Sequence, residues 1–237
     1  MLLTSPDNPE IKDLRKLLAD PAQRRDRRAF VIEGFKILQF AKNIQTVYLR
    51  EDVSPPDLPS CRRKIISRKI FKSLSDVESP QGILAVCAMP EPPVFAAHKK
   101  YIFLDRIQDP GNLGSIVRTA AALGLDGLIC NKGCADIFAP KAVRASMGAV
   151  FTLDLLRGEI ADFPGQIIAA DLTGSAPEDL RLSGGYILAV GNEGQGLAPE
   201  VLRLARQRVA LPFDRSRAES LNAAVAAGIL LYLLQKK

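Results

Sequence analysis

Residues 109–120 read Asp-Pro-Gly-Asn-Leu-Gly-Ser-Ile-Val-Arg-Thr-Ala, a glycine-bearing turn that leads from an apolar run towards a helix. Two later segments have the same setting: residues 190–197 read VGNEGQGL, and residues 211–222 begin with LPF and end with ESLN. Ligands of open α/β sheets bind outside the carboxyl ends of the strands. The three loops therefore predict one site that is assembled from three distant parts of the chain.

The pattern around these loops predicts the fold class. Expected strands lie at 101–104, 127–130, 150–153, 166–170, 186–190 and 208–211, and expected helices at 114–123, 140–147, 199–206 and 220–235. Nearly all-apolar strands that alternate with helices predict an α/β fold with a parallel sheet and helices on both of its faces.

The first part of the chain has an organisation of its own. A capped, proline-initiated helix is expected from Asn8, and the charged residues around it predict a basic N-terminal helical extension at 1–28. Strand and helix patterns alternate again at 29–92, which predicts a small α/β domain. Three prolines in residues 90–93 predict a linker, so a further domain is expected at 99–237.

Composition narrows the class of protein. Lys and Arg number 32 against 26 acidic residues, giving a net charge of +6, which favours a polyanionic partner over a merely solvated basic surface without excluding the latter. Two basic clusters lie in the first hundred residues: Lys12, Arg15, Lys16, Arg24, Arg25, Arg27 and Arg28, and then Arg62, Arg63, Lys64, Arg68, Lys69 and Lys72.

Other features bear on location and metals. The four cysteines are scattered and the single histidine, His98, is distant from them, so no metal site is expected. The first residues lack the features of a signal peptide, and the longest apolar run, 223–234, is shorter than the roughly 20 residues a bilayer requires. We therefore expect a cytoplasmic protein without membrane contact.

The first two loops differ in what they could bind. Glycines and a helix N-terminus at 111–114 suit an anion, and Arg118 could hold a phosphate, although an ordinary turn with a surface arginine is the alternative. The second loop has the glycine order G-x-x-G-x-G, which is not a dinucleotide fingerprint and disfavours a nucleotide-dependent oxidoreductase. Glu193 stands at its centre, and Arg118 is the candidate partner for its carboxylate.

The third loop precedes a very apolar helix. Ser220 has two readings, a helix N-cap or a functional hydroxyl, whereas Asn222 is expected inside the helix, where capping does not explain it. A helix that is apolar on nearly every face is expected to be buried on all sides, within the fold or against a second subunit. No hydrolytic triad is present in the sequence, and these residue types suit transfer from an already activated donor, which needs positioning and electrostatics.

In their order and spacing, the segments at 109–120, 190–197 and 211–222 resemble the three signature motifs of the SpoU (TrmH-like) RNA ribose 2'-O-methyltransferases of the SPOUT superfamily. The likeness covers about residues 100–237. The segment Phe30–Gly34 and its surroundings are similar to the small RNA-binding domain that often precedes this catalytic domain. The resemblance implies a C-terminal deep trefoil knot, S-adenosyl-L-methionine as cofactor, an RNA substrate and a homodimer formed through the knotted domain.

The resemblance also assigns residues. It implies a reactive site made of Asn112, Arg118, Glu193, Ser220 and Asn222, and cofactor contacts at Val190, Gly191, Leu211, Leu221 and Asn222. An arginine stays protonated in proteins, so Arg118 is expected to orient the ribose hydroxyl and a phosphate rather than act as a base. Ribosomal RNA is the expected substrate, with transfer RNA as the second class and a non-catalytic RNA-binding protein as the alternative from a different class.

Overall fold

The computed structural model describes residues 2–54, 58, 61–214 and 216–235. The chain divides into two compact units, each described here by itself. The first comprises Met1–Glu91 with Asp136–Phe151, and the second comprises Pro92–Ala135 with Thr152–Lys237. Residues 136–151 thus pack with the N-terminal unit although they lie within the later part of the sequence.

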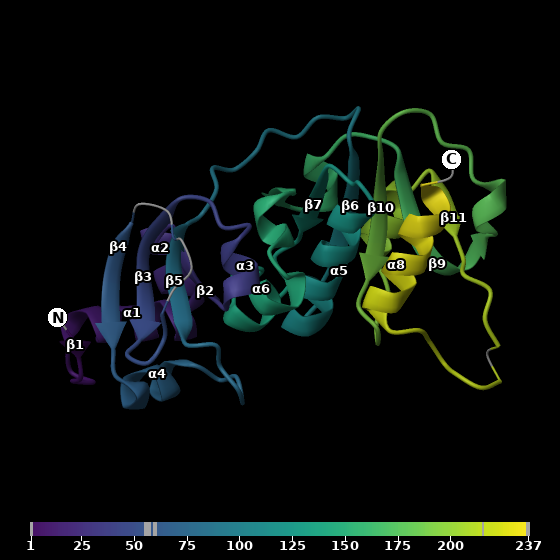
Figure 1. Ribbon diagram of the computed structural model, residues 1–237. Coiled ribbons are helices and arrows are strands. Elements are labelled where there is room, and N and C mark those ends of the chain that lie inside the picture. The colour runs from purple at the N-terminus through teal and green to yellow at the C-terminus, as the bar shows by residue number, and fades with distance from the viewer. Residues whose placement is uncertain (1, 55–57, 59–60, 215, 236–237) are drawn as a thin grey trace. The chain divides into compact units, whose positions relative to one another are not determined.

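The first unit is built on a mixed sheet in the order β1-β4-β3-β5-β2 (Figure 1). Its strands are β1 (Leu2–Leu3), β2 (Ala29–Glu33), β3 (Ile44–Arg50), β4 (Arg62–Ile66) and β5 (Ile83–Ala88). β4 runs parallel to β1 and β3, whereas β5 runs antiparallel to β2 and β3. Its helices are α1 (Pro9–Ala19), α2 (Pro21–Arg27), α3 (Phe35–Leu38), α4 (Arg68–Leu74) and α6 (Pro140–Ser146).

Both faces of this sheet are covered. One face carries a core in which Ile11 and Leu14 of α1 and Phe71 of α4 pack with strand residues such as Val31 and Ile66. The basic helix α1 is therefore amphipathic and rests on the sheet through its apolar stripe. On β2, Phe30 contacts the rings of Phe138 and Phe151, so the returning segment 136–151 completes the unit.

The second unit is built on a parallel sheet in the order β11-β9-β10-β6-β7-β8 (Figure 1). Its strands are β6 (Lys100–Asp105), β7 (Gly127–Cys130), β8 (Asp154–Arg157), β9 (Ile167–Ser175), β10 (Tyr186–Gly191) and β11 (Gln207–Val209). The central pair β6 and β10 is in register from Tyr186 opposite Lys100 to Gly191 opposite Asp105. Both strands therefore end at one edge of the sheet, as the sequence predicts.

Helices cover this sheet, which confirms the α/β class. They are α5 (Pro110–Ala122), α7 (Pro199–Leu204) and α8 (Ala223–Leu234), with short 3-10 turns at η2 (Ile160–Asp162) and η3 (Pro177–Asp179). Tyr101 and Phe103 of β6 pack with Val201 of α7, while the alternate residues Ile102 and Leu104 are equally buried. The helices α5 and α8 pack against each other, α5 against β7 and α8 against β10.

Two predicted elements differ from the structure. The strand expected at 150–153 is wrong: Ala149–Phe151 forms the 3-10 helix η1, and the strand β8 begins at Asp154, opposite Gly127. Val150 and Phe151 belong to the first unit, and their packing there explains why this segment is apolar although it is not a strand. The first site helix begins at Pro110 rather than Gly114, since Asp109 caps it.

Among the residues that the structure describes, no helix is both long enough and apolar enough to cross a membrane.

Candidate functional site

The site lies where β6 and β10 end and where α5 and α8 begin. The side-chain amide of Asn112 donates a hydrogen bond to the Glu193 carboxylate. Asn112 in turn accepts a hydrogen bond through its Oδ1 atom from Nδ2 of Asn222, at 3.1 Å. One residue from each of the three predicted loops thus joins a single hydrogen-bonded chain, and this convergence follows the prediction from sequence.

The start of α5 is fixed by its own cap. The Asp109 side chain accepts a hydrogen bond from the backbone N–H of Asn112 at 2.8 Å, and Pro110 occupies the first helical position. Asn112 is therefore held both through its backbone and through its side chain. An aliphatic residue would keep the backbone contact but would lose the side-chain hydrogen bonds to Glu193 and Asn222, which explains a polar residue in this first turn.

The second loop turns back on itself immediately after β10. Asn192 and Gly196 form an isolated antiparallel bridge, and the backbone N–H of Gly196 donates to the Asn192 carbonyl at 2.8 Å. A Cβ atom placed on Gly191 would lie 2.3 Å from the Gly196 carbonyl carbon. Gly191 is thus required by a close backbone approach, and Gly196 adopts a left-handed φ of 66°.

A buried carboxylate holds this loop to the end of β6. Asp105 is fully buried and accepts hydrogen bonds from the Asn131 amide at 2.8 Å, from the Arg106 guanidinium at 2.9 Å and from the backbone N–H of Ala198 at 2.6 Å. Arg106 reaches across to the Gln195 side chain and the Gly196 carbonyl. Buried carboxylates need such partners, so Asp105 and Arg106 form a clasp that shapes the second loop.

The sequence analysis did not single out Asp105, Arg106 or Asn131. The one available signal was a charged pair directly after the apolar run of β6. The partners of that pair, Asn131 and Ala198, lie 26 and 93 residues further on, and sequence alone does not join them.

Two ionisable groups at this edge of the sheet have shifted pKa values. The hydrogen bond with Asp105 raises the pKa of Arg106. Beside Asn131, the hydrogen bond with Cys130 lowers the pKa of Cys134, and the Cys134 thiol also contacts the Leu104 carbonyl at 3.1 Å. No cluster of three or more potential metal ligands occurs in the described part of the chain.

Two of the expected reactive residues stand apart from the hydrogen-bonded chain. Arg118 is exposed on α5, and it forms no hydrogen bond or ion pair with a residue that the structure describes. The partner of Glu193 is accordingly Asn112, so the expectation that Arg118 would pair with Glu193 is wrong. Ser220 is exposed and caps no helix.

The start of α8 also differs from expectation. Asn222 is the N-cap, and its Oδ1 atom accepts from the backbone N–H groups of Ala224 and Val225 at 3.0 and 3.2 Å. One face of α8 is open: the side chains of Val225, Ile229 and Tyr232 are 51%, 41% and 51% exposed. Within this chain the helix is therefore not buried on all sides.

Some residues of the basic clusters have a structural role. Arg24 is buried, donates to Asp136 at 2.8 Å and also contacts the backbone carbonyls of Leu17 and Leu18. By contrast, Lys16 and Arg25 are exposed and form no ion pair among the described residues. The positive charge available to a polyanion is thus smaller than the count of basic residues indicates.

The expected cofactor contacts lie around the same strand ends. Val190 and Gly191 end β10, while Leu211 and Leu221 are half-buried at the two ends of the third loop. A sulfonium nucleoside needs apolar walls for its ring and close backbone approach for its polar edges. The half-buried leucines fit the first of those needs, and the close approach of Gly191 to Gly196 fixes the backbone at the end of β10.

Comparison with known proteins supports this picture. The family model described as "SpoU rRNA Methylase family" matches residues 99–232, and the one described as "MRM3-like substrate binding domain" matches residues 8–85. The chain is 32% identical to the 23S rRNA (guanosine(2553)-2'-O)-methyltransferase RlmP of Bacillus subtilis, over 98% of both chains.

Solved structures agree with the sequence comparison. An AdoMet-bound rRNA methyltransferase from Sinorhizobium meliloti superposes with a TM-score of 0.87 at 29% identity, covering 100% of this chain and 97% of that one. The AviRb methyltransferase of Streptomyces viridochromogenes, in complex with AdoMet, gives a TM-score of 0.84 at 27% identity, with 97% of each chain covered.

Proposed function

Because the chain belongs to the SpoU rRNA methylase family, we propose that it transfers a methyl group from S-adenosyl-L-methionine to a ribose 2'-hydroxyl of ribosomal RNA. The observation that carries this proposal is the hydrogen-bonded chain from Glu193 through Asn112 to Asn222, which joins the three motif loops. Among the similar proteins that match this chain over nearly its whole length, the Bacillus subtilis and Sinorhizobium meliloti methyltransferases are named for ribosomal RNA alone, while others are named for both transfer and ribosomal RNA. These names favour ribosomal RNA as the substrate over transfer RNA.

Cofactor binding is assigned to the ends of β10 and of the third loop. Val190 and Gly191 would contact the cofactor from β10, and Leu211, Leu221 and Asn222 from the loop that leads into α8. The clasp of Asp105 and Arg106 keeps the second loop in the closed turn that places Gly191 beside Gly196. The residues that end β10 and begin α8 hold and orient the cofactor. Asp105 does not contact the cofactor in this proposal but acts through Arg106.

The bound cofactor supplies an electrophilic methyl group on a positively charged sulfur. With the cofactor bound, the ribose 2'-oxygen would form a new O–C bond to this methyl group, and the electron pair of the broken S–C bond would stay on sulfur. The hydroxyl proton leaves towards the adjacent phosphate and solvent. No water is consumed, so the site has to align the donor and the acceptor and exclude competing geometries.

We assign Arg118 to the binding and orientation of the RNA substrate. Its guanidinium stays protonated, so it can donate hydrogen bonds to the 2'-oxygen and to the neighbouring phosphate but cannot accept the proton. Its exposure and its lack of a partner among the described residues leave the guanidinium available for RNA. In this role Arg118 stabilises the negative charge that develops as the hydroxyl loses its proton.

The remaining polar residues position the first and third loops. Glu193 fixes the amide of Asn112, and Asn112 fixes the amide of Asn222, which also caps α8. A rigid chain of this kind keeps the reacting groups in one geometry during transfer. Ser220 is exposed on the third loop, and we assign its hydroxyl to a contact with the RNA backbone.

The two units take different roles in this proposal. We assign residues 99–237 to the methyltransferase domain, although its residues 136–151 pack with the first unit, and we assign RNA binding to residues 29–92 and the basic extension at 1–28. The match of residues 8–85 to a substrate-binding domain supports the second assignment. We further propose that the C-terminal segment threads a deep trefoil knot, a proposal supported by the return of α8 to pack on α5 and β10.

A homodimer completes the proposal. The exposed side chains of Val225, Ile229 and Tyr232 give α8 an apolar face that a second copy would cover. Light scattering on the purified chain tests this, and a monomer at micromolar concentration would contradict it. We place the enzyme in the cytoplasm, on the ground that the similar Bacillus subtilis protein, matched over 98% of both chains, is a bacterial ribosomal RNA methyltransferase.

The decisive experiment combines cofactor binding with mapping of the product. Calorimetric titration of the full chain with S-adenosylmethionine should show one site per chain, which a non-catalytic RNA-binding protein would lack. Ribosomal RNA from cells without the protein should lack one 2'-O-methyl group, and the purified protein should restore it. Restoration of a methyl group on a base, or the absence of any methyl transfer, would contradict the proposed function.

A further inference from the structure

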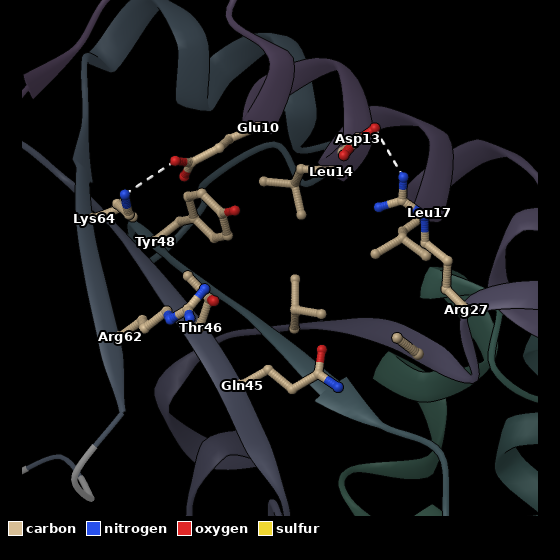
Figure 2. A pocket seen from close by; sticks show the side chains of 12 residues that line it. Glu10, Asp13, Leu14, Leu17, Arg27, Gln45, Thr46, Tyr48, Arg62 and Lys64 are labelled. Atoms are coloured by element: carbon tan, nitrogen blue, oxygen red, sulfur yellow. Dashed lines mark hydrogen bonds and ion pairs between the residues drawn. The ribbon is translucent and has the colours of Figure 1, made fainter.

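The first unit contains a cavity of about 280 Å³ under α1, at the amino ends of β3 and β4 (Figure 2). Leu14 and Leu17 of α1 and Val86 of β5 form an apolar side of it. Its other side is polar and comes from two neighbouring strands. The cavity is separate from the strand ends of the methyltransferase domain, and nothing in the proposed reaction uses it.

The strand register explains how the polar side is built. Thr46 pairs with Arg62 and Tyr48 pairs with Lys64, so these four side chains lie next to one another on the face below α1. The pairing of β3 with β5 shifts between Ile44 and Thr46, which leaves Gln45 in a β-bulge. A bulge redirects a side chain, and it allows Gln45 to line the same cavity as its neighbour Thr46.

Tyr48 gives the strongest indication of a ligand. Its side chain belongs to the core cluster and the residue is only 6% exposed, yet its hydroxyl forms no hydrogen bond with any residue that the structure describes. No fully buried polar side-chain atom in the described chain lacks a partner, so the Tyr48 oxygen is reached by solvent, and Tyr48 is one of the residues that line the cavity. Figure 2 shows the hydroxyl directed into it.

The charges around the cavity argue for a neutral occupant. Lys64 pairs with Glu10 at 3.0 Å, and Arg27 pairs with Asp13 at 2.9 Å, so two cations are already matched by carboxylates. A phosphate group would have to approach those carboxylates. Burial, together with the charges of Glu10 and Asp13, raises the pKa of Tyr48, so its hydroxyl keeps its proton and can donate.

Among the described residues that line the cavity, Arg62 is the one cation without a described carboxylate partner. Arg62 is exposed, lies beside Thr46 and forms no ion pair with a described residue (Figure 2). A guanidinium in this position can stack on a flat ring or contact the phosphate that follows it along a strand. The cavity therefore offers apolar contact, hydrogen bonds at the edges and one cation at the entrance.

From this arrangement we infer that the cavity binds one unstacked base of a single-stranded RNA segment, with the Tyr48 hydroxyl and the Gln45 amide reading its edge. Sequence-selective RNA recognition uses splayed bases that stack on side chains and hydrogen-bond along their edges. The inference rests on the proposed function, because it gives the RNA a specific hold on the N-terminal unit. It adds a contact by which the N-terminal unit selects the substrate.

Binding of short RNAs to the full chain tests the inference without any methyl transfer. The probes are the fluorescein-labelled pentanucleotides rA5, rC5, rG5 and rU5 and an abasic pentamer, measured by fluorescence anisotropy. We expect one base to bind at least about fivefold more tightly than the weakest, and both Tyr48→Phe and Gln45→Ala to weaken that binding by about fivefold, the loss of one hydrogen bond. Thermal unfolding checks that each variant folds.

Lys42→Ala is the matched control, since Lys42 is an exposed cation of the same unit that does not line the cavity. Its pentanucleotide binding should follow the wild type. Equal binding of the four homopolymers, equal binding of the abasic pentamer, or unchanged binding by a folded Tyr48→Phe variant would each overturn the inference. Preference lost equally in Lys42→Ala would also overturn it, because general charge would then account for the binding.

Methyl transfer provides the link to the proposed function. With saturating S-adenosylmethionine, Tyr48→Phe should raise KM for ribosomal RNA about fivefold and leave kcat and cofactor affinity unchanged. If the wild-type chain binds a preferred pentanucleotide through Tyr48 but transfers no methyl group, the proposed function fails and the base site stands. If transfer proceeds and Tyr48→Phe leaves KM unchanged, the base site fails and the function stands.

Discussion

The amide of Asn112, at the start of α5, donates a hydrogen bond to the carboxylate of Glu193, which lies 81 residues further along the chain. The contact fixes the second motif loop to the first helix of the site. Since Asn112 also accepts a hydrogen bond from Asn222, its side chain joins all three motif loops. Substitutions can separate the role of these hydrogen bonds from the roles of the adjacent residues.

Asn112→Ala removes the central member of the hydrogen-bonded chain. We expect kcat to fall by about 10- to 100-fold, because misplacement of reacting groups by as little as 1 Å has an effect of this order. The protein should stay folded, since Asp109 caps α5 through the backbone N–H of residue 112. Single-turnover kinetics at saturating cofactor and RNA measure the effect.

The same site allows a double-mutant cycle. If Asn112 and Glu193 act as one unit, adding Glu193→Ala to Asn112→Ala should reduce kcat little further. Additive losses in the double variant would show that the two side chains act independently.

Arg118→Ala tests the proposed contact with the ribose hydroxyl and phosphate. We expect cofactor affinity to match the wild type, while turnover falls by about 10²- to 10³-fold, because one donor to a developing negative charge is lost. Arg118→Lys should restore little, since an ammonium group lacks the planar fork of a guanidinium. Methylation of RNA by Arg118→Ala at a near-normal rate would show that the residue is not catalytic.

Asp105→Asn tests the clasp. The variant keeps the shape of the side chain but loses the charge that faces Arg106, and its new N–H donors oppose those of Arg106 and Ala198. Arg106 is partly exposed, which reduces the loss, so we expect a fall of about 2 kcal/mol in the free energy of unfolding. Cofactor affinity should fall as well, because the second loop is no longer held. Urea unfolding and calorimetry measure the two effects, and an unchanged cofactor affinity would limit Asp105 to a structural role.

Gly191→Ala tests the close approach within the second loop. The added methyl group would lie 2.3 Å from the Gly196 carbonyl carbon, so the loop has to move. We expect cofactor affinity to drop by about tenfold or more, equivalent to at least about 1.4 kcal/mol. Gly165→Ala is the control, since its methyl group would meet only Ile187 Cδ1, at 3.8 Å. A normal dissociation constant for Gly191→Ala would remove Gly191 from the cofactor site.

The sequence predicted the buried framework and the meeting of the loops because both follow from local patterns. Strands buried on both faces are continuous apolar runs, as in β6 and β10, and parallel strands bring their carboxyl ends to one edge. Val150 and Phe151 were misassigned because an apolar residue shows that it is buried but not in which core. In this chain both residues belong to the first unit, where the ring of Phe151 packs next to Phe30.

The remaining features of the fold and the site could not be predicted because they depend on partners that are distant in the sequence. The role of Asp105 depends on residues 26 and 93 positions away, and the bulge that turns Gln45 into the cavity depends on the register with β5. The exposure of Ile229 depends on which face of α8 meets α5, and a helix apolar all round carries no signal for that choice.

Asn222 has two functions that substitution can separate. Its Oδ1 atom caps α8, and its Nδ2 group donates to Asn112. Asn222→Ala loses both, and we expect a loss of about 1 kcal/mol in the free energy of unfolding together with a fall in kcat. Asn222→Asp keeps the capping oxygen, which also interacts favourably with the helix N-terminus, but has no donor for Asn112.

We therefore expect Asn222→Asp to unfold at the wild-type temperature and yet to lose about as much kcat as Asn222→Ala. Thermal unfolding and single-turnover kinetics on the same preparations give the two readouts. If Asn222→Asp retains wild-type kcat, the donated hydrogen bond does not matter and the cap accounts for the whole requirement. If both variants lose stability equally, Oδ1 does not act as the cap, and the start of α8 has to be assigned to another residue.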